Sequence, residues 1–293
     1  MKPRTIVLIG TSAIALAAIG WVTGQAAYSW LPPQASAESK LIDNLFSAMV
    51  GIGTFILLGV FLALAYSVLF FRAGRYDYTD GPAMEGNLSV EIIWTVIPFI
   101  LAMGIAIYSY FIYEQMSIVG PMEHVHGSAK TAEQDPGVIQ VVARQWSWEF
   151  YYPRSGVTST ELHLPNNQRA KLVLRSEDVL HGFYVPAFRI KQDIIPGRAI
   201  DFQFTPVQEG RYRLRDSQYS GTYFAAMQTD VVVESPESYR QWLEEGAKRT
   251  AKPAYNQAFE EYNRSSGSAL HAGWKTVIPA NPPIVNYSFT PDK

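Results

Sequence analysis

The chain has 293 residues, of which 48% are hydrophobic, and its 24 basic and 26 acidic residues leave a formal net charge of −2. This balance gives no support for nucleic-acid binding, which requires a basic patch. The chain contains no cysteine, which excludes disulfides and every thiolate metal site, and its length suits one or two domains.

The N-terminal segment begins with a short basic stretch and continues without formal charge to residue 37. Residues 6–22 are apolar enough for a marginal membrane span or for the hydrophobic region of a signal peptide. Small residues at Ala35-Ser36-Ala37 suit a signal peptidase, although the less apolar stretch before them is long for such a signal. Residues 1–37 are therefore predicted to be either a cleaved signal peptide or an N-terminal membrane segment. In both cases, the basic start places the N-terminus in the cytoplasm.

Two long uncharged runs follow, at residues 44–71 and 92–113. At about 1.5 Å per residue, each helix would cross a hydrocarbon core of about 30 Å. Arg72 and Arg75 lie between the runs, and the positive-inside rule places this loop in the cytoplasm. Residues 41–116 are thus predicted to form a transmembrane helical hairpin, with the rest of the chain outside the cytoplasm. A soluble helical hairpin is the less favoured alternative, because such long uncharged runs are rare in a soluble core.

Residues 117–137 are predicted to be a polar linker. The linker contains His124 and His126, which could suggest a metal pair. Because no further ligands stand nearby, we expect solvated side chains there instead.

From residue 138 the pattern changes to short alternating runs separated by turn residues, which predicts strands. Residues 138–235 are therefore expected to form an all-β sandwich. Ser235 and Pro236 then suit the N-cap and first position of a helix. Residues 236–293 are predicted to be a C-terminal helix and an extended tail. The clearest strand patterns are at residues 139–141, 171–175, 200–204 and 231–233.

The start of the second predicted span carries a recognisable motif. Glu91, Trp94-Thr95 and Pro98 follow one another at a spacing that resembles the second helix of subunit II of the haem-copper terminal oxidases. In that family the matching glutamate lies at the entrance of a proton channel, so the resemblance implies this role for Glu91. On the residues alone, Glu91 is better explained as an acid in the first turn of a helix capped by Asn87, and the resemblance reverses that preference.

A second resemblance to subunit II covers residues 180–227. In cytochrome c oxidases this region folds as a cupredoxin and holds a two-copper electron-entry centre, with an isolated His followed by the pattern Cys-x-Glu-x-Cys-x-x-x-His-x-x-Met. Both cysteines are replaced here, and without soft thiolates a mixed-valence copper pair cannot form. The resemblance therefore implies a cupredoxin-like domain that holds no metal and whose former ligand positions serve packing. Those positions fall on His181, Asp216, Gln218, Ser220, Phe224 and Met227.

Two further segments match the family's electron-entry region. Trp146 and Trp148 stand in an aromatic segment whose first tryptophan takes the electron from cytochrome c in the family. Without a copper acceptor, we expect these residues to be a vestige, packed as an aromatic strand. Glu177 and Asp178 match an acidic face for cytochrome c, but two adjacent acids are also typical of a solvated turn.

The resemblance implies subunit II of a membrane haem-copper terminal oxidase of the respiratory chain, which couples oxygen reduction to proton translocation. The fold implied is a transmembrane hairpin plus a cupredoxin-like sandwich on the periplasmic or lumenal side of a cytoplasmic or thylakoid membrane. This chain would hold no cofactor, and the haems and one copper would lie in subunit I. The implied partners are oxidase subunits I and III, membrane lipid and, as substrate of the complex, a quinol. Residues 21–25 and 31–33 are also similar to cyanobacterial subunits II, which suggests an alternative respiratory oxidase.

The loss of the copper ligands favours quinol as the electron donor, because quinol-oxidising members of the family show the same loss. One alternative is a cytochrome c oxidase subunit II that passes electrons from a soluble carrier by another route. Another, of a different class, is a membrane-tethered cupredoxin-like protein for assembly or metal delivery.

Overall fold

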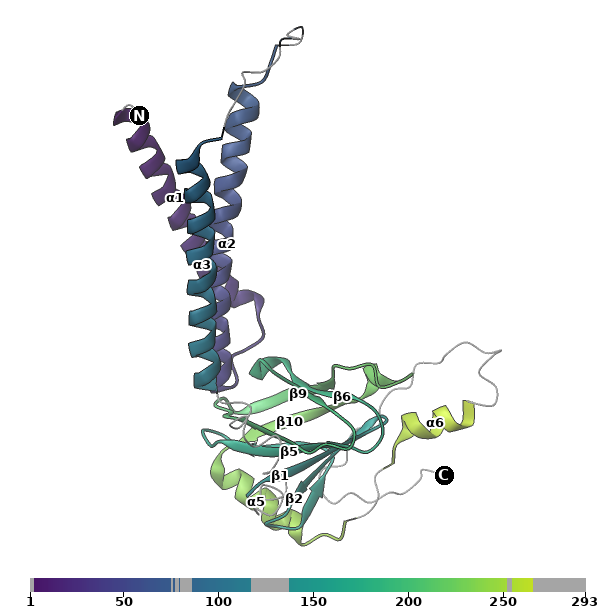
Figure 1. Cartoon of the computed structure of the whole chain (residues 1–293). Helices are drawn as coiled ribbons and strands as arrows, with labels where there is room; N and C mark the ends of the chain where they lie inside the picture. Colours follow the sequence, from purple (N-terminus) through teal and green to yellow (C-terminus); the bar gives the residue numbers. More distant parts are fainter. Residues whose placement is uncertain are drawn as a thin grey trace. The chain divides into compact units, whose positions relative to one another are not determined.

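The computed structural model describes residues 3–74, 76, 79, 86–116, 137–251 and 255–265 (Figure 1). The chain divides into two compact units, a helical unit of residues 1–31 and 41–115 and a β unit of residues 32–40 and 116–293. The predicted linker with His124 and His126, and the tail after residue 265, lie outside the described residues.

Three helices are long and apolar enough to cross a membrane: α1 (Pro3–Ala27), α2 (Ala37–Phe70) and α3 (Leu88–Met116). The predicted hairpin helices are α2 and α3, and both extend beyond the predicted uncharged runs. With 34 residues, α2 is about 51 Å long, which exceeds the hydrocarbon thickness. A short 3-10 helix, η1 (Tyr28–Trp30), follows α1.

The β unit contains two five-stranded sheets, which confirms the predicted sandwich. The first sheet has the order β3-β2-β1-β5-β8 and the second the order β4-β10-β9-β6-β7. The pairs β1–β5 and β4–β10 are parallel, and the other pairs are antiparallel. All four clearest predicted strands lie within observed ones. The strands are β1 (Ile139–Arg144), β2 (Ser147–Tyr152), β3 (Val157–Ser159), β4 (Leu162–Pro165), β5 (Ala170–Ser176), β6 (His181–Val185), β7 (Ile190–Ile194), β8 (Ile200–Phe204), β9 (Gly210–Asp216) and β10 (Gln228–Glu234).

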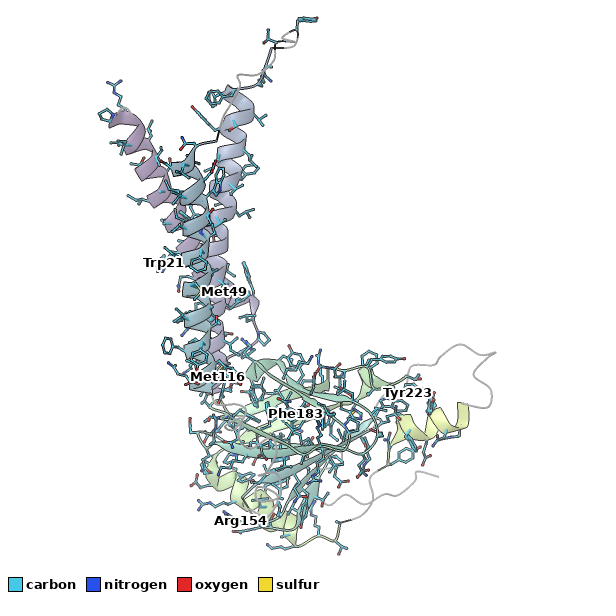
Figure 2. The ribbon with its side chains drawn as sticks, viewed as in Figure 1. Trp21, Met49, Met116, Arg154, Phe183 and Tyr223 are labelled. Carbon is cyan, nitrogen blue, oxygen red and sulfur yellow. The ribbon has the colours of Figure 1, made fainter. Side chains whose placement is uncertain are left out.

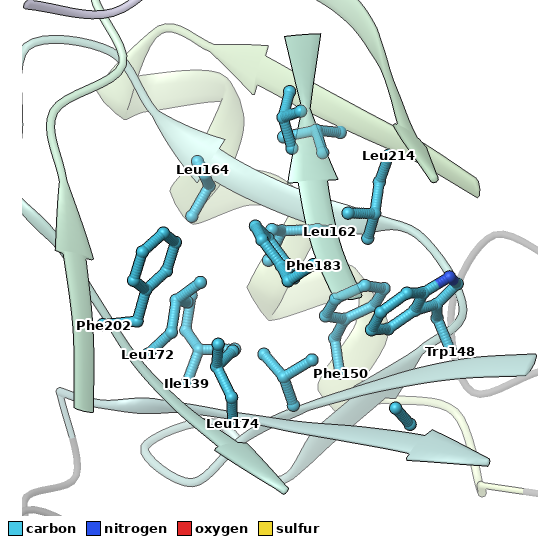
Figure 3. Packing of buried hydrophobic residues seen from close by; sticks show 14 of the residues in the cluster. Ile139, Trp148, Phe150, Leu162, Leu164, Leu172, Leu174, Phe183, Phe202 and Leu214 are labelled. Carbon is cyan, nitrogen blue, oxygen red and sulfur yellow. The ribbon is translucent and has the colours of Figure 1, made fainter. Parts of the chain in front are cut away.

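The core of the sandwich consists of the alternate side chains that each sheet turns inward (Figure 3). Phe183 of β6 is fully buried, and its ring meets those of Trp148 and Phe202 at centroid distances of 5.9 and 5.6 Å. The two ring contacts link the second sheet to β2 and β8 of the first. Strand β6 also pairs with β9, with Phe183 opposite Asp216, and this register brings the start of β6 close to the end of β9.

Two helices follow the sandwich, and only the first matches the predicted C-terminal helix. Helix α5 (Pro236–Ala247) begins as expected, with the Ser235 side chain accepting from the Ser238 N–H. Its Trp242 stacks on the ring of His163 at 3.9 Å. A second helix, α6 (Gln257–Ser265), was not predicted, and its Ala258 is buried in the core cluster.

Residues 32–40 belong to the β unit, whereas the sequence assigned them to the N-terminal segment and the start of the hairpin. The Ala35 N–H donates to the Ala187 carbonyl, and the Ala35 carbonyl accepts from the Val207 N–H. Ser36 caps α2, because its Oγ accepts from the Ser39 N–H at 3.0 Å. Glu38, which is 2% exposed, pairs with Arg169 at 2.7 Å. We call residues 34–39 the strap.

The buried position of Phe183 yields a test of the fold. Phe183→Ala would leave a cavity between the sheets, and we expect it to lower the free energy of unfolding of the β unit by about 3 to 5 kcal/mol. Tyr219→Ala is the matched control, because Tyr219 is 78% exposed. Urea denaturation followed by tryptophan fluorescence measures both, and equal effects of the two substitutions would contradict this packing.

Candidate functional site

The candidate site is a charged triad at the position where the sequence predicted a lost copper centre. His181 begins β6 and Asp216 ends β9, so the strand register brings the two together. The Nδ1 atom of His181 lies 2.7 Å from Asp216 Oδ2, and its Nε2 atom lies 2.8 Å from Asp178 Oδ1. The His181 side chain and that of Asp216 are fully buried. A ring with a carboxylate on each nitrogen is the arrangement expected of an imidazolium.

The charges of the triad follow from its geometry. Burial alone would lower the pKa of His181, but the hydrogen bonds to Asp216 and Asp178 outweigh it, so this pKa lies above its ordinary value of 6.5. Partial burial would likewise raise the pKa of Asp178, but hydrogen bonds from the Gln145 N–H and from His181 hold it below 3.8. Both shifts favour the charged forms, an imidazolium at His181 and a carboxylate at Asp178.

Asp216 is fixed by the backbone as well as by the ring. Its Oδ1 atom accepts from the Gly182 N–H at 2.7 Å and from the Gln218 N–H at 3.0 Å. A Cβ atom at Gly182 would collide with the Ser217 hydroxyl and lie 3.2 Å from the Gln218 backbone nitrogen, so a larger residue here would require both to shift. The Asp216 carboxylate, at the position matched to the first cysteine of the family pattern, is thus held by the backbone of the paired strands.

The other former ligand positions do not converge on one point. Gln218 turns its Nε2 to Asp193 Oδ1 at 2.8 Å, and the Ser220 carbonyl accepts from the Trp146 indole N–H at 3.1 Å. Phe224, in the 3-10 helix η4 (Phe224–Ala226), packs against the exposed ring of Tyr219. Met227 is 1% exposed and is part of the core cluster.

The residues at this position do not fit a copper pair. The chain has no thiolate, and both His181 nitrogens are engaged by carboxylates. Among the residues that the structure describes, no group of three or more His, Asp or Glu side chains could hold a metal ion. The arrangement can carry charge and hold strands together, and its carboxylate oxygens are not the soft ligands that copper prefers.

Asp178 was missed as a member of the site. The sequence suggested an acidic face or a solvated turn for Glu177 and Asp178, and Glu177 has that outward position, where it pairs with Arg144 at 2.9 Å. The Asp178 side chain is 30% exposed, but its carboxylate is directed to His181 and to the Gln145 N–H, from which its Oδ2 accepts at 2.7 Å. The i,i+3 spacing of Asp178 and His181 is the signal that could have indicated this contact.

The aromatic segment with Trp146 and Trp148 is buried, and α6 covers part of it. Trp146 is 6% exposed, and its ring meets those of Tyr223 and Tyr262 edge-on at 5.2 and 5.3 Å. Tyr262 comes from α6, near which Figure 2 shows Tyr223, and Asn256 just before α6 donates to the Gln145 carbonyl at 2.9 Å. Trp148, on β2, packs inside the sandwich.

Glu91 lies in the first turn of α3, in the helical unit, whereas the triad lies in the β unit. Asn87 caps this helix as predicted, since its Oδ1 accepts from the N–H groups of Ser89 and Val90 at 3.1 and 3.3 Å. Pro98 stands inside α3. The carboxylate folds back against Gly86, where a Cβ would lie 2.6 Å from Glu91 Oε1. The geometry is compatible with a helix-terminal acid and leaves the proton-channel assignment as a prediction.

Comparisons with known proteins identify similar chains. The sequence matches the cytochrome c oxidase subunit II transmembrane domain over residues 24–112 and the periplasmic domain of the same subunit over residues 154–235. A cytochrome c oxidase subunit 2 from Thermostichus vulcanus is 34% identical over 252 residues, with 72% of this chain and 77% of the relative covered. One from Synechocystis sp. is 31% identical over 247 residues, with coverages of 73% and 74%. A quinol oxidase subunit 2 from Bacillus spizizenii is 23% identical over 235 residues, with coverages of 79% and 68%.

The triad predicts a pH dependence of stability. Because the pKa of His181 is raised on folding, its protonated form contributes fully below about pH 6.5 and is lost as the pH rises through the higher folded pKa. We therefore expect the melting temperature of the native chain to exceed that of His181→Gln most at about pH 5 to 6, and less at about pH 9.

The difference between the two melting curves isolates the triad, because the other titrating groups are common to both chains. Asp178 acts at the acid end, where its contribution is present above pH 3.8 and is lost as the pH falls through its lowered pKa. A difference that stays constant between about pH 5 and 9 would mean that folding does not shift the pKa of His181, and a difference that grows as the pH rises from about 5 would mean that burial keeps the ring neutral.

Proposed function

The chain belongs to the cytochrome c oxidase subunit II family and is a membrane protein with its β unit outside the cytoplasm, and from this we propose that it serves a quinol-oxidising haem-copper terminal oxidase as a subunit without a redox centre. In this function the chain supports the catalytic subunit and assists proton uptake. The haems and the oxygen-reducing copper belong to subunit I.

The observation that carries the proposal is the charged triad in place of a copper centre. A soluble one-electron carrier such as cytochrome c needs an acceptor near the protein surface. Here a fully buried His181 and two carboxylates occupy that position, and none of them exchanges electrons at respiratory potentials. A quinol dissolved in the membrane can deliver its electrons directly to a haem of subunit I, so it requires no acceptor in this chain.

The cover over Trp146 supports the same donor. A tryptophan that receives electrons from a docked protein must lie close to the docking surface, whereas Trp146 is buried under residues of α6. An electron that reached Trp146 would therefore find no acceptor in this chain, and the Trp146 ring offers no open face to a docked protein.

A second candidate function is a cytochrome c oxidase subunit II. It is favoured by the relatives from Thermostichus vulcanus and Synechocystis sp., which carry that name and are more similar to this chain than the quinol oxidase subunit from Bacillus spizizenii. A membrane-tethered assembly or metal-delivery protein is the alternative of another class. It predicts a chain that does not copurify with a haem-bearing subunit.

Donor specificity of the purified complex tests the proposal. We expect rapid oxygen consumption with a short-chain quinol and only background consumption with reduced cytochrome c, because the complex has no electron-entry centre outside the membrane. Metal analysis should find one copper for each complex, the copper of subunit I.

Trp146→Phe is the matched variant, since phenylalanine keeps an aromatic ring in the packed position. The proposal expects it to leave the quinol rate unchanged. Rapid turnover with cytochrome c that falls in Trp146→Phe would establish the second candidate instead, and a chain isolated without haem would establish the third.

The position of Glu91 gives a second test. A carboxylate at the cytoplasmic edge of a membrane span is a functional-site hypothesis, because its charge is costly there unless it is used or paired. Glu91→Gln removes the titrating group at nearly constant size, and we expect a several-fold lower turnover with unchanged haem content.

Glu114→Gln is the control, because Glu114 lies at the other end of α3. It should leave turnover unchanged. Proton uptake and oxygen consumption are measured on both complexes after haem content has been matched, and equal turnover in the two would remove Glu91 from the proton path.

A further inference from the structure

Helix α1 buries one narrow stripe over its last two turns. Gly20, Gly24 and Ala27 are buried, at the i, i+4 and i+7 spacing of a single helix face. The neighbouring Trp21, labelled in Figure 2, is 68% exposed, so burial is confined to the side that carries the small residues. A signal peptide has no need for such a face.

The stripe lies against the backbone of α2. A Cβ atom added at Gly20 would lie 2.6 Å from the Gly51 carbonyl oxygen, and one at Gly24 would lie 2.7 Å from the Ser47 carbonyl oxygen. Each is closer than real Cβ atoms come, so only glycine permits this approach. The α2 side is also small, with Ser47 and Gly51 four residues apart. Small residues at i,i+4 on both helices are the usual means by which membrane helices pack closely.

Polar contacts fix the pairing at the end of α1. The Ser47 hydroxyl donates to the Gly24 carbonyl at 2.8 Å, and the Tyr28 hydroxyl donates to Asn44 Oδ1 at 2.7 Å. Such hydrogen bonds between helices stabilise association in lipid, where water cannot replace them. The contact between α1 and α2 therefore has shape complementarity and hydrogen bonds.

The small residues that suit a signal peptidase, Ala35 and Ser36, are packed into the β unit. Ala35 and Ser36 are fully buried, and Ala35 joins the backbone of the sandwich at Ala187 and Val207. Ser36 also donates from Oγ to the Phe188 carbonyl at 2.9 Å while capping α2. Cleavage after Ala37 would remove the cap and both backbone connections from the folded chain. The small residues that suit a peptidase are required here by close packing and by capping.

We propose that residues 1–37 are not removed and that α1 remains in the mature chain as a third transmembrane helix, packed on α2 through Gly20 and Gly24. The basic start holds the N-terminus in the cytoplasm. Helix α1 then ends outside the cytoplasm, where the strap joins the β unit. Helix α2 crosses the membrane back to the cytoplasm. The connection between α1 and α2 thus lies on the same side as the sandwich, as three spans require. This inference does not depend on the electron donor.

The first experiment determines the mature N-terminus. The chain is taken from the oxidase complex purified from native membranes, and its intact mass and N-terminal peptides are measured. We expect peptides from residues 3–37 in the mature chain. A chain that begins at Glu38, or at any residue after Gly24, would overturn the proposal.

The second experiment tests the packing with a matched pair in the same helix. Gly20→Leu places a side chain against the Gly51 carbonyl, whereas a Cβ atom at Gly10 meets no atom within 4 Å, so Gly10→Leu begins in open space. Both gain the same apolar volume and helix propensity. We expect Gly20→Leu to lower the melting temperature of the complex by several degrees and Gly10→Leu to leave it unchanged. If Gly20→Leu fails to accumulate, Gly20→Ala adds only the Cβ and should give a smaller loss. Equal melting temperatures for the Gly20 and Gly10 variants would refute the packed third span.

The third experiment uses the absence of cysteine from the chain. Thr5→Cys and Lys40→Cys each introduce one thiol, and a membrane-impermeant maleimide reports its side. We expect Lys40→Cys to react in intact spheroplasts and Thr5→Cys to react only after the membrane is opened. Reaction of Thr5→Cys from outside, or its absence from the mature chain, would contradict this topology.

Discussion

An imidazolium held between two carboxylates is the interaction on which the arrangement of the β unit around residue 181 depends. His181 contacts Asp216 at the end of β9 and Asp178 in the turn before β6, so one ring links the start of β6 and the turn before it to a strand end 35 residues away. Such a buried ion group contributes little net stability compared with apolar packing, but removing one member leaves an unpaired charge and costs about 3 to 5 kcal/mol. The triad therefore fixes how the strands meet more than it adds to their stability.

The sequence allowed the hairpin helices and the sandwich to be predicted, because uncharged runs and alternating strands are local patterns. It did not reveal that Asp178 turns inward, since an acid in a turn has the same local signature whether it faces water or a buried ring. It also missed α6, whose burial depends on Trp146, more than a hundred residues earlier. The strap was misassigned for a related reason, because small residues suit a peptidase and a tight backbone contact equally well.

Two features of the β unit bear on the proposed function. The triad lies between β6 and the end of β9, whereas the cover over Trp146 comes from α6, and both contact Gln145. In the proposed function, the chain needs neither an electron acceptor at the first nor an open surface at the second. Both are compatible with a domain whose sandwich is retained for assembly with other subunits, since the apolar core that determines the fold, around Phe183, requires no metal.

The fixed geometry of Asp216 limits what single substitutions can do at this position. Asp216→Cys would remove a partner from the buried His181 ring and leave the Gly182 and Gln218 N–H groups with a poorer acceptor. A second substitution, Ser220→Cys, would not relieve that defect. A thiolate copper site therefore cannot be built here one residue at a time without a loss of stability, because the carboxylate that it would replace is bound through both of its oxygens.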